Sequence, residues 1–274
     1  MNQGTTQSSR SIILNPMISV IESIGSYILD SFRSKAEPIH FVKEMLSQMI
    51  RPPIRTNLIF QHFYFIGNQS INIIVLTGFF IGGVFGLQLG LLLKIFGAES
   101  MMGAATAKTL TTVLSPLTTS FLLAGRGGAA ITAELATMNV NEQVEAMEAM
   151  AVDPVHYLVV PRFIAAIVIL PLLCGIFTFV GVIGAFVIGV LMFDVDQGLF
   201  FEKIGMITTI NDVIKGLVKA VVFGGVISTI ACYYGLTAAG GAEGVGRATT
   251  NSVVMTLLTM LMFDLVITYF QTVF

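Results

Sequence analysis

The stretch NVNEQVEAMEAMAVDPVHYLVVPR, residues 139–162, is an acidic and helix-like segment between two long apolar runs. From Gly127 to Pro161 the chain has no Lys or Arg, but it has five acidic residues, which are Glu134, Glu142, Glu145, Glu148 and Asp153. Two membrane spans need no acidic amphipathic helix between them in order to fold. The pattern indicates either a docking surface for a second protein or a charged loop in water, and the spacing alone favours neither.

The composition identifies the broad class of protein. Of the 274 residues, 55% are hydrophobic and 11% are charged, whereas a soluble domain has about 25% charged residues. This balance predicts an all-α integral membrane protein. The net charge of -2 and the lack of a basic cluster argue against a nucleic-acid partner.

The apolar runs predict five membrane-spanning helices, since each is long enough to cross the hydrocarbon core. The predicted spans are residues 63–93, 104–138, 163–192, 213–234 and 249–270. Residues 1–62 precede them and contain a polar tail, an amphipathic run at 12–29 and a basic connector. The amphipathic run predicts a helix that lies along the membrane surface. The chain therefore divides into an amino-terminal region, 1–62, and a membrane domain, 63–274.

The Lys and Arg residues predict the orientation in the membrane. An amino terminus in the cytoplasm places nine of them on the cytoplasmic side and five on the other side, which agrees with the positive-inside rule. Residues 139–152 then lie in the cytoplasm. The carboxyl terminus lies outside.

The acidic segment predicts a helix at residues 139–152. Asn139 suits the N-cap position, and Glu142 stands three residues later, as in a capping box. Asp153-Pro154 ends the predicted helix. The apolar residues of one face are Val144, Met147 and Ala151, with Met150 beside them. Because the acids repel one another mildly, a basic or apolar groove on a partner suits this helix.

Two isolated charges lie in or beside the apolar runs. Arg126 is near the end of the second predicted span, where it either anchors at lipid headgroups or caps a neighbouring helix. Asp264 lies inside the last predicted span, where an ionisable residue is costly and marks a functional site by default. It is either such a site or a hydrogen-bond acceptor for the threonines of that span, which are Thr256, Thr259 and Thr268.

Glycines form a regular pattern in the first predicted span. Gly78, Gly82, Gly86 and Gly90 recur every fourth residue. They place a smooth stripe on one helix face, which predicts close packing against another helix.

Enzyme motifs are missing from the sequence. It contains no G-x-x-x-x-G-K-[ST], no H-E-x-x-H and no G-x-S-x-G. We therefore expect no catalytic residue, no bound cofactor and no metal. Cys174 and Cys232 lie in apolar runs and are expected to be small buried residues.

Three motifs resemble one known family. LAGRGGAAITAELATMNVNEQVEAMEAMAVDPVHYLVVPR, residues 123–162, resembles the cytoplasmic signature of the MlaE/YrbE permeases. GAEGVGRATTNSVV at 241–254 is similar to the second signature of that family, and FFIGGVFGLQ at 79–88, with AES at 98–100, is similar to its first span. These permeases are membrane subunits of MCE-associated ABC transporters, which move phospholipid or other lipids between membranes.

The resemblance implies an assembly. It implies a homodimer in the bacterial inner membrane, with an amino-terminal interfacial helix and five spans in each subunit. The helix at 139–152 would be the coupling helix that docks into a cytoplasmic ATPase, which would hold ATP and Mg. A hexameric ring of MCE-domain proteins would lie on the outer side, and a small STAS-domain protein is a further possible partner.

The resemblance also implies site residues. Those expected at the lipid cavity between the two subunits are Phe85, Gln88, Leu92, Leu93, Phe96, Val113 and Leu114. Those expected at the ATPase are Glu134, Glu142, Glu145, Met147, Glu148, Met150, Asp153 and Pro154. One departure is visible, since residues 112–116 read TVLSP where the family commonly has Arg-Glu-Leu-Gly-Pro. The expected cavity is therefore more apolar, or takes a different lipid.

Two other functions compete with this interpretation. One is an ion-coupled secondary transporter that uses Asp264 as its proton or cation site. The lack of an inverted repeat and the single acid inside a span argue against it. The other is a passive membrane anchor for a complex.

Overall fold

The computed structural model describes residues 37–49 and 56–273, and every regular element within these residues is a helix. This confirms the predicted all-α class for the described part of the chain. The predicted surface helix at 12–29 lies outside the described residues. The chain divides into two units, residues 1–47 and 48–274. Helix α2 (Glu37–Met49) crosses their boundary and occupies part of the predicted connector.

Four helices among the described residues are long and apolar enough to cross a membrane. They are α3 (Thr56–Lys94), η4 with α8 (Val155–Phe193), α10 (Ile210–Leu236) and α11 (Gly241–Val273). They correspond to the first, third, fourth and fifth predicted spans. Each extends beyond its predicted bounds, because polar residues at the ends, such as Asn57 and Arg247, are also helical.

The second predicted span is a series of shorter segments. Two π-helical turns of five residues each divide it, and the segments in order are α4 (Met102–Thr109), η2 (Leu110–Leu114), α5 (Ser115–Leu123), η3 (Ala124–Gly128) and α6 (Ala129–Val140). The backbone is helical at every join. Pro116 has no N–H to donate to Thr112, and η3 contains three glycines, so both places are weak points for a regular α-helix.

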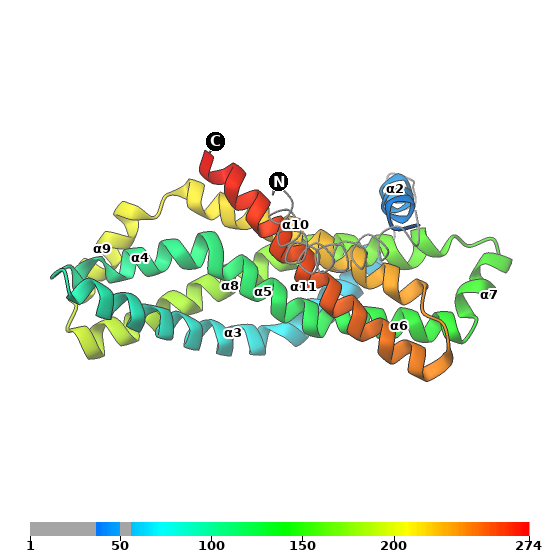
Figure 1. The fold of residues 1–274 in the computed structure, drawn as a ribbon, viewed down its shortest axis with the longest axis horizontal. Helices are drawn as coiled ribbons and strands as arrows, with labels where there is room; N and C mark the ends of the chain where they lie inside the picture. The colour runs from blue at the N-terminus through cyan, green and yellow to red at the C-terminus, as the bar shows by residue number, and fades with distance from the viewer. Residues whose placement is uncertain (1–36, 50–55, 274) are drawn as a thin grey trace, which may run out of the picture. The chain divides into compact units, whose positions relative to one another are not determined.

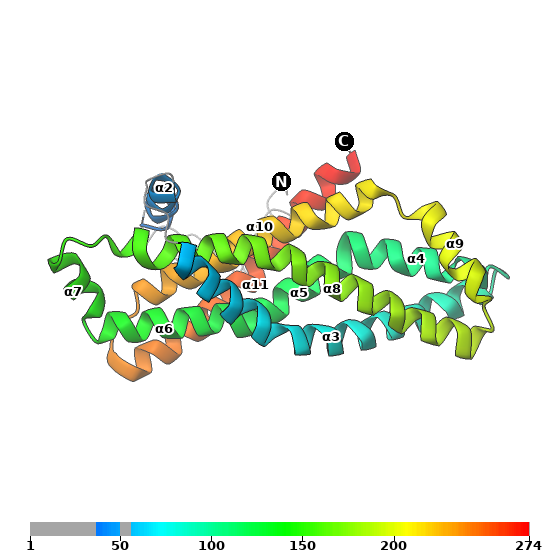
Figure 2. The same cartoon turned by 180° about the vertical axis from the view of Figure 1, so that it is seen from behind.

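The second unit has two distinct ends. Helix α7 (Gln143–Ala149) lies at one end and α9 (Gln197–Ile207) at the opposite end (Figures 1 and 2). At the α7 end the Asn139 amide of α6 donates to the carbonyl oxygen of Ala238, just after α10, at 2.9 Å. At the α9 end, α9 packs beside α4 and the short helix η1 (Glu99–Met101). Side chains at the α7 end and side chains at the α9 end therefore cannot form one common site.

A seam of glycines joins α3 to α8. A Cβ at Gly82 would lie 2.0 Å from the carbonyl oxygen of Gly181, and a Cβ at Gly184 would lie 2.2 Å from that of Phe79. Gly78 is close to the backbone of Phe177 in the same way. The two helices thus touch backbone to backbone. This confirms that the glycine stripe of the first predicted span packs closely.

The seam gives a direct prediction for stability. Gly82→Ala forces α3 and α8 apart and costs about 1–3 kcal/mol, the usual effect of overpacking. Gly175→Ala on α8 is the matched control, because a Cβ there meets nothing within 4 Å. Thermal unfolding of the detergent-solubilised chain measures both variants. Equal unfolding midpoints for Gly82→Ala and Gly175→Ala would contradict a close backbone contact at Gly82.

Candidate functional site

The acidic helix predicted at residues 139–152 is shorter in the structure. Helix α7 covers only Gln143–Ala149, because α6 continues through Val140. The prediction of Asn139 as N-cap is wrong, since Asn139 lies inside α6. The residue before α7 is Glu142, whose φ of 59° places it in the left-handed region. No side chain caps the amino end of α7, so a capping box is absent there.

Helix α7 presents acids and methionine to its surroundings. Val144 is buried and Met147 is half-buried, so this face holds α7 against the rest of the unit. Glu145 and Glu148 are exposed, and so is Met150 just after the helix. The result is a small acidic and apolar surface at the α7 end. It has the properties of a docking surface, and within residues 37–49 and 56–273 the side chains of Glu145, Glu148 and Met150 are left exposed.

Asp153 and Pro154 begin a helix rather than end one. The Asp153 Oδ1 atom accepts hydrogen bonds from the backbone N–H groups of Val155 at 2.9 Å and His156 at 3.2 Å. The Asp153 side chain therefore satisfies two N–H groups at the start of η4 (Val155–Val159), one residue before the Pro154 that precedes η4. Helix α7 ends earlier, at Ala149, and Ala151 with φ 58° turns the chain. The predicted end of the acidic helix was therefore placed too late.

An ion pair between a buried arginine and an exposed glutamate braces the two helices that flank α7. Arg162 on α8 is 2% exposed, and its Nη2 atom lies 2.9 Å from Oε1 of Glu134 on α6. Its Nη1 atom donates to the carbonyl oxygen of Leu158 at 3.1 Å. A buried guanidinium requires such partners, since an unpaired buried charge is strongly destabilising. Glu134 was predicted to contact the ATPase; the structure places it in this brace, one helix before α7.

Sequence reasoning missed the role of Arg162. It counted only as one of the cytoplasmic charges, because 28 positions separate it from Glu134 in the printed sequence. The available signal was its place directly after an apolar run, at the end of the family signature.

Arg126 bonds to the first span. Its Nη2 atom donates to the side-chain oxygen of Gln69 at 2.9 Å, and its Nη1 atom donates to Oγ of Ser70 at 3.2 Å. Both partners lie inside α3, so Arg126 links η3 to α3 and does not cap a helix end.

Asp264 has a buried partner. Lys219 on α10 is 1% exposed, and its Nζ atom lies 2.8 Å from Oδ1 of Asp264 and 2.7 Å from Oγ1 of Thr268 on α11. One turn earlier on α10, Lys215 donates to the carbonyl oxygen of Gln271 at 2.8 Å. These contacts join α10 to α11. The carboxylate is compensated, which favours a structural role over a free ion site.

The Lys219–Asp264 pair predicts a non-additive effect on stability. Asp264→Leu leaves the buried Lys219 cation unpaired and costs about 3–5 kcal/mol. Lys219→Met is also destabilising, whereas the double variant removes both charges and recovers most of the loss. Thermal midpoints of the four proteins in detergent measure the coupling. If the double variant loses as much stability as the two single variants together, the proposed coupling between Lys219 and Asp264 is contradicted.

The residues predicted at the lipid cavity lie mostly on one surface of α3. Phe85 and Leu114 line an apolar groove of about 220 Å³ between α3 and η2, together with Phe80, Ile81 and Val84. Leu93 and Val113 are half-buried, and Gln88, Leu92 and Phe96 are exposed. The structure therefore brings Phe85 and Leu114 together. It does not gather the other five around them.

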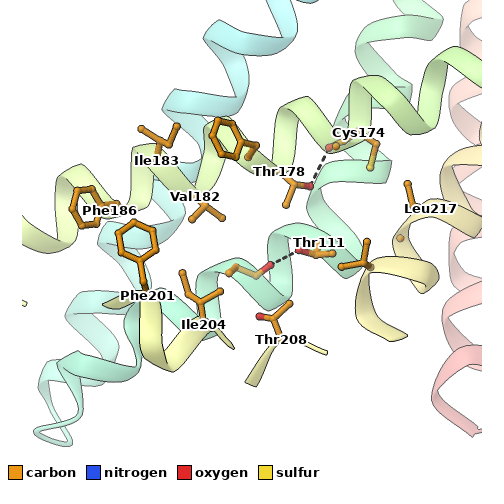
Figure 3. A pocket seen from close by; sticks show the side chains of 15 residues that line it. Thr111, Cys174, Thr178, Val182, Ile183, Phe186, Phe201, Ile204, Thr208 and Leu217 are labelled. Atoms are coloured by element: carbon orange, nitrogen blue, oxygen red, sulfur yellow. Dashed lines mark hydrogen bonds between the residues drawn. The ribbon is translucent and has the colours of Figure 1, made fainter. Parts of the chain in front are cut away.

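A larger hollow lies elsewhere in the same unit. It has a volume of about 530 Å³ and is lined by residues of α4, η2, α8, α9 and α10 (Figure 3). Sequence reasoning missed it because its walls come from four separate stretches of the chain. The groove on α3 and this hollow have no lining residue in common.

Long apolar helices in one packed unit, with glycine seams and apolar hollows, define an α-helical integral membrane protein. A family model described as permease MlaE matches residues 59–270. The chain belongs to the MlaE permease family.

Relatives of known name agree with this assignment. A probable ABC transporter permease protein of Rickettsia conorii is 39% identical over 247 residues, which cover 90% of this chain and 91% of that protein. A probable ABC transporter permease protein of Synechocystis is 40% identical over 193 residues, or 70% and 73% of the two chains. The intermembrane phospholipid transport system permease protein MlaE of Haemophilus influenzae is 34% identical over 255 residues, or 92% and 97%.

Proposed function

We propose that this chain is the permease subunit of an ABC transporter that moves phospholipid between membranes. The observation that carries the proposal is the similarity to the Haemophilus influenzae phospholipid permease, which extends over 97% of that protein. An apolar groove also supports the proposal, because it is lined by Phe85 and Leu114, two of the residues that the family resemblance expects at the lipid cavity. The chain itself would be non-catalytic and hold no cofactor, and ATP and Mg would be bound by a partner.

Helix α7 would dock onto the cytoplasmic ATPase as the coupling helix. Its acids, Glu145 and Glu148, and the neighbouring Met150 are exposed and so available to a partner. The Glu134–Arg162 pair ties α6 to α8 on either side of α7. A displacement of α7 by the ATPase would therefore move α6 and α8 together, as a rigid-body motion requires.

A second copy of the chain would complete the lipid site. The groove of about 220 Å³ between α3 and η2 is smaller than the usual range of about 300–1,000 Å³ for a ligand site. Phe80 and Val84 on its rim are exposed, so a matching surface of another copy can cover them. None of the groove-lining residues is charged, which suits acyl chains rather than a headgroup.

The proposed assembly has a fixed orientation. The α7 end would face the cytoplasm of a bacterium whose inner membrane holds the chain. The α9 end and the carboxyl terminus would face the periplasm, where a hexameric MCE-domain ring would receive or deliver lipid. A STAS-domain protein on the ATPase is a further proposed partner.

Charge reversal on α7 tests the coupling. In Glu145→Lys/Glu148→Lys the acidic surface becomes basic, and association with the ATPase weakens by at least about tenfold because like charges now face each other. Glu202→Lys is the control, since Glu202 is also exposed but lies on α9 at the opposite end. Co-purification with the ATPase measures both variants, and lipid transport in vesicles measures the α7 variant. Full transport by the α7 variant would refute its role in coupling.

A bulky substitution on α3 tests the lipid path. Leu92 lies seven residues after Phe85 and on the same helix face, so Leu92→Trp would obstruct the lipid and lower the transport rate by about tenfold, equivalent to ~1.4 kcal/mol in the barrier. Leu172→Trp on α8 is the matched control, because Leu92 and Leu172 are both 54% exposed. A passive membrane anchor would tolerate both changes equally.

A further inference from the structure

The hollow of about 530 Å³ lies within a single copy of the chain. It is in the half of the second unit toward the α9 end, and Figure 3 shows side chains of α8 on one side of it and those of α9 and η2 on the other. The π-helical turn η2 separates it from the groove on α3, since Thr111 lines the hollow and Leu114 lines the groove. We call this hollow the inner cavity. Its volume is within the usual range for a ligand site.

The inner cavity has the chemistry of a hydrocarbon site. No charged residue is among those that line it, and aliphatic and aromatic side chains such as Val182, Phe186 and Ile204 make most of its wall. Two lining hydroxyls are already satisfied by their own helices, since Thr111 donates to Ala107 and Thr178 donates to Cys174 (Figure 3). A ligand there would gain from apolar contact rather than from charge.

One polar atom on the wall lacks a partner. The hydroxyl of Thr208, between α9 and α10, is buried and makes no hydrogen bond to any residue that the structure describes. A buried hydroxyl without a partner costs free energy, and such groups call for an explanation. A ligand with one polar atom near Thr208 would supply the missing hydrogen bond.

The cavity wall is tightly packed at Gly216 and leaves open space at Gly175. A Cβ at Gly216 would lie 2.2 Å from the carbonyl oxygen of Thr111, so α10 and η2 touch and close that side. Gly175 also lines the cavity, yet a Cβ there meets nothing within 4 Å. The π-helical turn η2, whose Thr111 lines the cavity, is a type of distortion that occurs often at functional sites.

The inner cavity opens on the side of the helical unit. Phe179 is 69% exposed and Ile183 is also exposed, and both line the cavity. They belong to α8, one of the helices long and apolar enough to span a membrane, so the opening would face the membrane interior when α8 spans it. A lipid chain can therefore enter it sideways. We propose that the inner cavity binds one hydrocarbon chain of a membrane lipid, separately from the groove on α3.

The proposal does not depend on ATP-driven transport. The bound chain belongs either to a lipid in transit or to a resident lipid that stays with the permease, and both have the same hydrocarbon chemistry. Labelling the intact complex before and after addition of ATP distinguishes the two. Labelling that falls with turnover indicates a lipid in transit, and constant labelling indicates a resident lipid.

The test uses a phosphatidylethanolamine that carries a photoreactive diazirine in one acyl chain. The full-length chain is purified in detergent, mixed with the probe and irradiated, and the labelled residues are mapped by mass spectrometry. Labels are expected on α8 and α9 around Phe179 and Phe201, which line the cavity. Gly175→Leu places a side chain in the open space and reduces these labels by about tenfold, equivalent to ~1.4 kcal/mol.

Gly205→Leu on α9 is the matched control. A Cβ at Gly205 also meets nothing within 4 Å, but Gly205 does not line the cavity, so its labelling should equal that of the wild type. If Gly175→Leu fails to fold, Ile183→Trp at the opening replaces it. The proposal is overturned if a folded cavity variant is labelled as strongly as the wild type. It is also overturned if wild-type labels are as dense on the exposed α11 residue Leu258 as on the cavity wall.

Discussion

The backbone contact between α3 and α8 is the constraint on which the rest of the membrane unit depends. Lipid gives two apolar helices no hydrophobic gain when they pack together, so they associate through close contact and polar links. Glycines at 82, 181 and 184 allow the close contact. Polar links then attach the remaining helices: Thr132 of α6 donates to Ala231 of α10 at 3.1 Å and contacts the Ser252 hydroxyl of α11 at 2.9 Å.

This construction separates the two ends of the unit. The α7 end is held by the Glu134–Arg162 ion pair and presents an acidic surface, whereas the half toward the α9 end contains the apolar groove and the inner cavity. The rigid α3–α8 pair extends through both halves (Figure 1). Such an arrangement suits a permease in which force from an ATPase at one end changes the shape of a lipid site nearer the other, because packed helices move as bodies rather than bend.

Much of the fold could be predicted from the sequence, but the contacts of several residues could not. The apolar runs and the stripe from Gly78 to Gly90 were sufficient to predict the long helices and their close packing. The partner of Asp264 was not predictable, because Lys219 reads as an outer charge until α10 is placed beside α11. The inner cavity depends on side chains from four separate stretches, which no local pattern connects. Asn139 was misassigned because its residue type suits an N-cap, whereas α6 continues past it to Val140 and its side-chain amide donates to Ala238.

The composition of the native complex tests the central claim most directly. The tagged chain, extracted from its own membrane in a mild detergent, would be analysed by mass spectrometry for both proteins and lipids. A phospholipid-transporting permease of the ABC type predicts co-purification of an ABC ATPase and an MCE-domain protein, with bound phospholipid. A folded chain that carries neither partner nor phospholipid would contradict the account.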